Sequence, residues 1–149
     1  MSLKINFDKP LDFKPKNFMN LKNVCGLYLI FLPKRKISYP FGDSRLIYIG
    51  MSEKVTNSIS SRLIGHFEGK TGNFGLKNYR STDSLSFTYI NFEAVKSFWP
   101  QRIEDFESVF ILDFVENYGV YPICNNKTGF PELSKELENL LSIDWSYFN

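Results

Sequence analysis

Cysteine and histidine are scarce in this chain of 149 residues, and their scarcity limits the chemistry that it can carry. The two cysteines, Cys25 and Cys124, are too few for a disulfide framework, so we expect a reducing, cytoplasmic compartment. We interpret both cysteines as small apolar packing residues. The single histidine, His66, excludes a metal centre built from several histidines.

Long apolar runs are also missing. No run approaches the roughly 20 residues that cross a bilayer, and no signal peptide is visible, so we expect no membrane partner. The sequence contains neither internal repeats nor low-complexity segments. The formal net charge of +2 and the pI of about 8.5 permit nucleic-acid binding but do not indicate it by themselves.

Aromatic side chains, by contrast, are abundant. Phe, Trp and Tyr make up 17% of the chain, with 15 Phe and 8 Tyr, so we expect large rings to build much of the core. The hydrophobic content of 43% and the charged content of 23% are typical of a globular protein. A chain of this length forms one domain and can bury a sizeable core.

Two apolar runs near the start of the chain predict a hairpin. Residues 27–31 and 46–49 are rich in strand-favouring side chains. The polar segment between them contains Pro33 and Gly42, which favour a chain reversal. Residues 85–92 are also β-rich and predict a third strand.

Three segments carry helical signals. Asn57 or Ser58 can cap a helix that runs to about Phe67. Pro100 fits the first turn of a longer helix that Gly119 can end. We expect the buried face of this longer helix to contain Ile103, Phe106, Phe110, Phe114 and Tyr118. Leucines recur on one side of residues 131–141 and predict a C-terminal helix.

Two segments are predicted to be irregular. Residues 1–23 form an N-terminal arm, and we favour packing of Phe13 and Phe18 on the body over contact of its lysines with a phosphate backbone. The glycine-rich segment 69–75 predicts a flexible loop in a basic part of the sequence. That loop is either a solvated surface or a DNA contact.

The predicted fold class is a small α/β (α+β) domain. We expect a three-stranded, mainly antiparallel sheet flanked by helices over residues 24–130. The arm of residues 1–23 precedes this domain, and the C-terminal helix of residues 131–149 packs on it.

Polar side chains beside the predicted apolar stripes are candidates for chemistry. Arg62 and His66 are four residues apart, so they share one flank of their helix and point near the sheet. Glu107 falls within the apolar stripe of the longer helix. A buried, unpaired carboxylate is costly, so Glu107 needs a metal, a rim position or a salt bridge to an arginine at the core edge.

Two tyrosines lie in the predicted hairpin. Alternation places Tyr48 on one face of its strand together with Leu46 and Gly50, and gives Tyr28 a face of its own strand. If these faces coincide, both phenols can point at one phosphate, and the flanking glycines let another backbone or a phosphate approach closely. Tyrosine is also an ordinary strand residue, so the pair alone indicates no function.

These residues resemble a family signature. Gly26-Leu27-Tyr28 and Tyr48-Ile49-Gly50 resemble the paired tripeptides of the GIY-YIG nucleases, with Leu where Ile is commoner. The segment Pro122-Ile123-Cys124-Asn125 is similar to the Pro-x-x-Asn element of that family, with Asn126 as the alternative asparagine. The resemblance covers roughly Val24 to Asn126.

The resemblance implies a DNA endonuclease with one divalent metal per site. In that family a glutamate on the helix after the third strand is the only protein ligand of Mg²⁺ or Mn²⁺, and Glu107 stands at this position. Arg62 would neutralise charge on the phosphate, and His66 would assist it or relay a proton. Asn125 would position the site by hydrogen bonding.

The implied reaction is hydrolysis of a DNA phosphodiester bond. The metal would bind the scissile phosphate and stabilise the leaving 3′-oxygen. Tyr28 or Tyr48 would activate the attacking water as general base. One metal site cuts one strand, so double-strand cleavage would need a homodimer or sequential nicks.

Two other readings stay open. A non-catalytic nucleic-acid-binding module could keep the same fold, although a module that only binds does not need a carboxylate aimed at a phosphate. A purely structural domain would bury Glu107 against an arginine and would have no affinity for metal.

Overall fold

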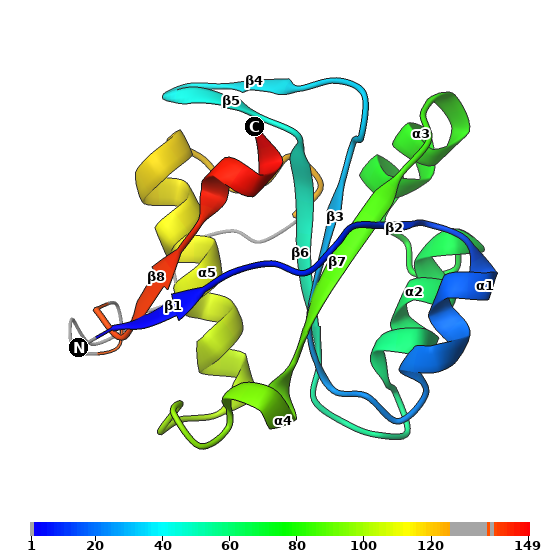
Figure 1. Cartoon of the computed structure of the whole chain (residues 1–149). Coiled ribbons are helices and arrows are strands. Elements are labelled where there is room, and N and C mark those ends of the chain that lie inside the picture. Colours follow the sequence, from blue (N-terminus) through cyan, green and yellow to red (C-terminus); the bar gives the residue numbers. More distant parts are fainter. Residues whose placement is uncertain (1, 126–136, 138) are drawn as a thin grey trace.

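A computed structural model describes residues 2–125, 137 and 139–149 of the chain. The fold is mixed α+β, with a four-stranded antiparallel sheet and helices on both of its faces (Figure 1). The strand order is β2-β7-β3-β6. The strands are β2 (Leu11–Asp12), β3 (Gly26–Phe31), β6 (Leu46–Ser52) and β7 (Ser86–Asn91).

Strand β3 lies in the middle of the sheet, and all six of its residues are buried. It pairs with β6 on one side and with β7 on the other, which confirms the three predicted strands. The prediction of three strands was one short, because β2 from the N-terminal arm pairs with β7. The polar segment between β3 and β6 forms a second hairpin from β4 (Ile37–Tyr39) and β5 (Gly42–Ser44).

Helix α5 (Ile103–Tyr118) packs on one face of the sheet, and its predicted apolar face is buried. Gly119 ends the helix in the left-handed region, with a φ of 94°, as the sequence predicted. The helix does not begin at Pro100. The Trp99 indole donates a 2.9 Å hydrogen bond to the Arg102 carbonyl oxygen, which holds these residues in a turn before the helix. A short helix, α4 (Phe92–Val95), follows β7 directly.

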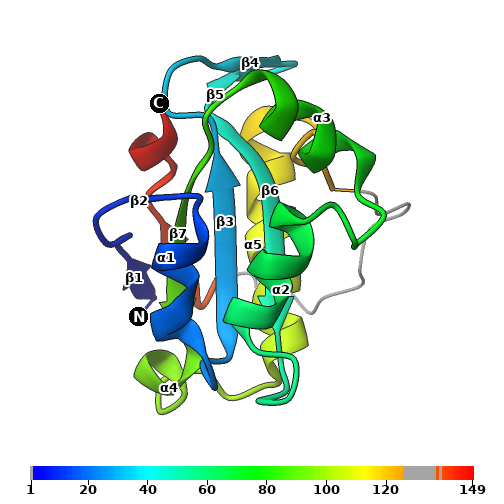
Figure 2. The same cartoon turned by 90° about the vertical axis from the view of Figure 1, so that its right-hand side faces the viewer.

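Three helices cover the opposite face of the sheet (Figure 2). They are α1 (Pro15–Phe18), α2 (Ile59–Phe67) and α3 (Phe74–Thr82). Helix α2 confirms the predicted segment, and the Ser58 side chain caps it by accepting a hydrogen bond from the Ser61 amide. Ile59 and Leu63 on its apolar stripe are fully buried.

Helix α3 begins at Phe74, so the loop predicted over residues 69–75 ends at Asn73 and its last two residues are helical. The Asn73 side chain accepts a 3.0 Å hydrogen bond from the Leu76 amide and so starts a helix that the glycines had obscured. Position 75 of this helix is a glycine because the helix passes close to the Cys124 side chain there. A Cβ at Gly75 would lie 2.9 Å from the Cys124 sulfur.

The N-terminal arm has more structure than the irregular segment that the sequence predicted. It contains β1 (Leu3–Ile5), β2, α1 and a 3₁₀ turn, η1 (Met19–Leu21). Phe13 and Phe18 are both buried in the core beside α2, which confirms that they pack on the body.

The end of the chain returns to its beginning. Strand β8 (Leu141–Ile143) pairs in parallel with β1, and the 3₁₀ turn η2 (Trp145–Phe148) buries Trp145 and Phe148 beside α5. The predicted helix over residues 131–141 lies largely outside the described residues, and Leu141 belongs to a strand. In the described part of the chain, every helix is too short or too polar to cross a membrane.

Candidate active site

Tyr28 and Tyr48 lie on the same face of the sheet, on adjacent strands. Tyr28 pairs with Gly50 and Tyr48 pairs with Ile30, so both phenols point toward α2, with ring centroids 6.0 Å apart. This confirms that the two tyrosine faces coincide. Tyr28 is fully buried, whereas Tyr48 is partly exposed.

Leu46 does not share the face of Tyr48, contrary to strict alternation. The register of β6 shifts between Ile30 and Phe31, so that Leu46 lies opposite Phe31 and Ile47 is an extra residue. Such a bulge reverses the alternation locally. Leu46 therefore joins the core beside α5, while Ile47 packs on the side of α2.

The two signature glycines make room for the protein's own atoms. A Cβ at Gly50 would lie 2.4 Å from Cζ of Tyr28, because the Tyr28 ring lies across it. A Cβ at Gly26 would lie 1.9 Å from the Ile90 carbonyl oxygen on β7. Both close approaches are internal, and at Gly26 it is another backbone that comes close, which is one of the two alternatives that the sequence offered.

Helix α2 brings Arg62 and His66 to the Tyr28 hydroxyl. His66 Nε2 lies 3.0 Å from that oxygen, and Arg62 Nε donates a 3.3 Å hydrogen bond to it. The His66 ring also meets the Tyr48 ring edge to face at 5.2 Å. The spacing of four residues thus directs both side chains from α2 toward the sheet, as predicted.

Burial determines the protonation of this cluster. Burial, together with the Arg62 charge, lowers the pKa of His66 to about 4, so the ring is neutral at neutral pH. Burial also raises the pKa of Tyr28 well above its usual value. The pKa of Tyr48 is raised by burial as well, with Arg62 acting against the shift. Both phenols therefore keep their protons at neutral pH.

Glu107 approaches the cluster from the other side of the sheet. It lies on α5, is 6% exposed, and its charge contributes to the raised pKa of Tyr48. This carboxylate is therefore near the phenol of Tyr48, although the two residues come from elements on opposite faces. Strand β6 is the edge of the sheet, and α5 packs beside it.

A divalent cation at this position would rest on one carboxylate. Among the described residues, no three His, Cys, Asp or Glu side chains come together. Mg²⁺ usually keeps several water ligands and is bound by one or two protein carboxylates together with substrate phosphates. The single carboxylate of Glu107, beside the edge strand of the sheet, fits this pattern.

Asn125 holds the edge strand. Its Oδ1 accepts a 3.0 Å hydrogen bond from the Ile49 amide, and its Nδ2 donates a 2.9 Å bond to the Ile49 carbonyl oxygen. Ile49 stands between Tyr48 and Gly50, so this pair of bonds fixes the backbone that carries both. Asn126, the alternative candidate, lies outside the described residues.

One residue at the cluster was not predicted. Thr71 follows α2, and its Oγ1 lies 2.8 Å from His66 Nδ1, the nitrogen that faces away from Tyr28. A threonine in a glycine-rich loop carries no periodic signal, so nothing in the residue pattern singles it out.

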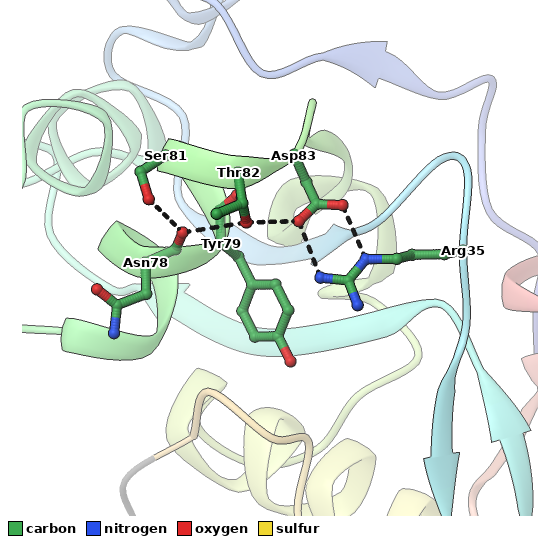
Figure 3. A network of polar contacts seen from close by, with 6 residues as sticks. All are labelled: Arg35, Asn78, Tyr79, Ser81, Thr82 and Asp83. Atoms are coloured by element: carbon green, nitrogen blue, oxygen red, sulfur yellow. Dashed lines mark hydrogen bonds and ion pairs between the residues drawn. The ribbon is translucent and has the colours of Figure 1, made fainter.

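Helix α3 lies on the same face of the sheet as α2 (Figure 2), and an ion pair joins its C-terminal end to the segment after β3. Arg35 Nε and an amino group donate hydrogen bonds of 2.8 and 2.9 Å to the two oxygens of Asp83 (Figure 3). The same carboxylate accepts a 2.7 Å bond from Thr82, and the guanidinium lies over the Tyr79 ring. These contacts with Arg35 and Thr82 lower the pKa of Asp83 to about 2.

Comparisons of the chain with models of known protein families, with curated proteins and with solved structures find no match. A function for this protein therefore has to be inferred from the chemistry of the cluster.

Proposed function

We propose that this protein is a metal-dependent endonuclease of the GIY-YIG type that hydrolyses DNA phosphodiester bonds. The observation that carries the proposal is the convergence of Tyr28, Tyr48, Arg62 and His66 in one contact cluster, with the charge of Glu107 acting on it. These residues come from β3, β6, α2 and α5, which are far apart in the sequence.

Arg62 and Glu107 give the site complementary charges. The Arg62 guanidinium is half-buried beside two neutral phenols, so it can neutralise charge that grows on a phosphate. Glu107 would hold Mg²⁺ or Mn²⁺, which when bound supplies Lewis-acid stabilisation of the phosphate and the leaving oxygen.

Tyr48 is the better placed phenol to take a proton from the attacking water. It is partly exposed and near Glu107, whereas Tyr28 is fully enclosed. A cation beside Glu107 would offset the rise in the pKa of Tyr48 that burial and the carboxylate cause. Tyr28 lies deeper in the protein than Tyr48 and does not meet the water itself. Its hydroxyl accepts a hydrogen bond from Arg62 and contacts His66.

The test is nicking of supercoiled plasmid with Mg²⁺ or Mn²⁺. We expect the wild type to nick, EDTA to stop it, and Glu107→Gln to abolish it with DNA binding retained. Glu116→Gln is the matched control, because it neutralises an exposed carboxylate on the same helix. A wild type that binds plasmid, single-stranded and branched DNA without cutting any of them would support a non-catalytic binding module. Equal nicking by wild type and Glu107→Gln would remove Glu107 from the site.

The single carboxylate also bears on how two strands are cut. One site of this kind cuts one strand, so linear plasmid should appear only after nicked plasmid unless two chains act together. A linear product that forms directly, with a rate that rises as the square of protein concentration, would support a homodimer.

A further inference from the structure

We propose that Tyr28, His66 and Thr71 form a route by which a proton leaves the enclosed phenol of Tyr28 for solvent, with Thr71 as its exit at the surface. The inference rests on the proposed nuclease function and adds a positioning residue to it. Its basis is a chain of contacts, 3.0 Å from Tyr28 Oη to His66 Nε2 and 2.8 Å from His66 Nδ1 to Thr71 Oγ1.

Exposure changes in one direction along this chain. Tyr28 is 0% exposed and His66 is 4% exposed, whereas Thr71 is an exposed residue. A proton that arrives at Tyr28 therefore has no direct contact with solvent. The imidazole connects this enclosed oxygen to a hydroxyl group at the surface.

The neighbouring arginine determines the direction of one hydrogen bond at the Tyr28 hydroxyl. A guanidinium can only donate, so the Tyr28 oxygen accepts from Arg62 Nε and keeps its own hydrogen for another acceptor. In the route that we propose, His66 Nε2 accepts that hydrogen. In a neutral ring the other nitrogen, Nδ1, then carries the hydrogen and donates it to Thr71 Oγ1.

The Tyr28 and Thr71 oxygens each gain one proton and lose one, whereas the imidazole gains a proton at Nε2 and loses one at Nδ1, so it changes tautomer. The Tyr28 O–H bond breaks as a bond forms at His66 Nε2, and the Nδ1–H bond breaks as Thr71 Oγ1 gains that proton. Thr71 gives its own hydrogen to a water molecule. The Tyr48 O–H bond breaks as its hydrogen-bond partner, the Tyr28 oxygen, gains that proton, and Tyr48 takes the proton of the attacking water. The imidazole ends neutral, which suits a ring whose charged form is disfavoured by burial and by Arg62.

The loop holds Thr71 in place for this role. The Lys70 amide donates a 2.9 Å hydrogen bond to the Gly65 carbonyl oxygen, which turns the chain back over α2. The methyl group of Thr71 packs against Gly65, where a Cβ would lie only 3.0 Å from it. Gly72 continues the turn in the left-handed region, with a φ of 74°.

The first experiment reads the tautomer of His66 by ¹⁵N NMR. His66 is the only histidine of the chain, so its ring signals need no assignment by mutation. We expect Nδ1 to carry the hydrogen in the wild type and in Thr71→Ser, and this population to fall in Thr71→Val. A wild-type ring protonated at Nε2, or one unchanged in Thr71→Val, would overturn the route.

The second experiment measures nicking with saturating metal. We expect kcat to fall about 10-fold or more in Thr71→Val, to recover in Thr71→Ser, and KM for DNA to stay unchanged. Thr56→Val is the control, because it removes a hydroxyl from an exposed loop outside the cluster. Full activity in Thr71→Val would overturn the route alone. A wild type with no activity would overturn the nuclease and the route together, so the two failures are distinguishable.

Discussion

The aromatic ring of Tyr28 lies across the Cα of Gly50 on the neighbouring strand. A Cβ on Gly50 would come within 2.4–2.7 Å of three ring and hydroxyl atoms of Tyr28. The ring is fully buried, and its hydroxyl lies between His66 and Arg62, so it has little freedom to move aside. Gly50 is therefore part of how the site is built.

Replacing Gly50 by alanine should destabilise the fold and displace the Tyr28 hydroxyl. We expect a loss of about 1–3 kcal/mol in the free energy of unfolding, because an added methyl group overpacks a filled core. Urea denaturation measures this loss. Gly42→Ala is the control, since a Cβ there would meet its nearest neighbour only at 4.0 Å. Equal stability of the two variants would contradict the packing described here.

Stability should depend on pH through His66. The pKa of His66 is about 4 in the folded protein and 6.5 in its ordinary state, so between these values only the unfolded chain binds the proton. The stability contributed by the neutral ring is complete above pH 6.5 and is lost as the pH falls toward 4. The slope is at most about 1.4 kcal/mol per pH unit.

Urea unfolding at pH 7.5, 6.0 and 5.0 measures this slope. His66→Gln removes the titrating ring, so its stability should fall less steeply over the same range. Carboxylates contribute equally to both proteins, so the difference between them isolates the histidine. Parallel curves would show that His66 titrates in the folded protein as it does in the unfolded chain.

Loss of Asn125 should loosen the edge strand. Asn125→Ala removes both hydrogen bonds to the Ile49 backbone, and we expect a cost of about 1–3 kcal/mol. Amide hydrogen exchange should accelerate at Ile49, and nicking should weaken because Tyr48 loses its fixed backbone. Asn117→Ala on the surface of α5 should leave Ile49 protected. Unchanged exchange at Ile49 in Asn125→Ala would mean that these bonds do not hold the strand.

Breaking the ion pair in Figure 3 should have a local effect. Arg35→Gln leaves Asp83 without its forked partner, and we expect faster amide exchange at Asp83, whose N–H bonds the Tyr79 carbonyl oxygen at 2.7 Å. Global stability should change little, because exposed ion pairs are screened by water and salt. Lys36→Gln, one residue away, should not alter exchange in α3.

Local patterns predicted the elements that depend on local causes. The apolar runs gave β3, β6 and β7, the Ser58 cap gave the start of α2, and Gly119 gave the end of α5. Helix α3 was missed because glycines outweighed a single capping side chain, that of Asn73.

Features that depend on distant parts of the chain were not predictable in this way. The bulge at Ile47 changed which face Leu46 occupies, and pairing of β1 with β8 carries no signal in either segment alone. At the cluster, spacing predicted that Arg62 and His66 face the sheet. The contact of Thr71 with His66 depends on a loop that folds back, and the bonds of Asn125 to Ile49 join residues from different regions of the chain.

Parallel pairing of β1 with β8 has a consequence for synthesis. Leu3 donates a 2.7 Å hydrogen bond to the Leu140 carbonyl oxygen, and its strand partner is Leu141. Ribosomes add about 5–20 residues each second, so the first strand waits on the order of ten seconds for its partner. During that wait β1 offers an unpaired edge to other chains. Slow translation should therefore favour aggregation of nascent chains, and a chaperone that shields Leu3–Ile5 should relieve it.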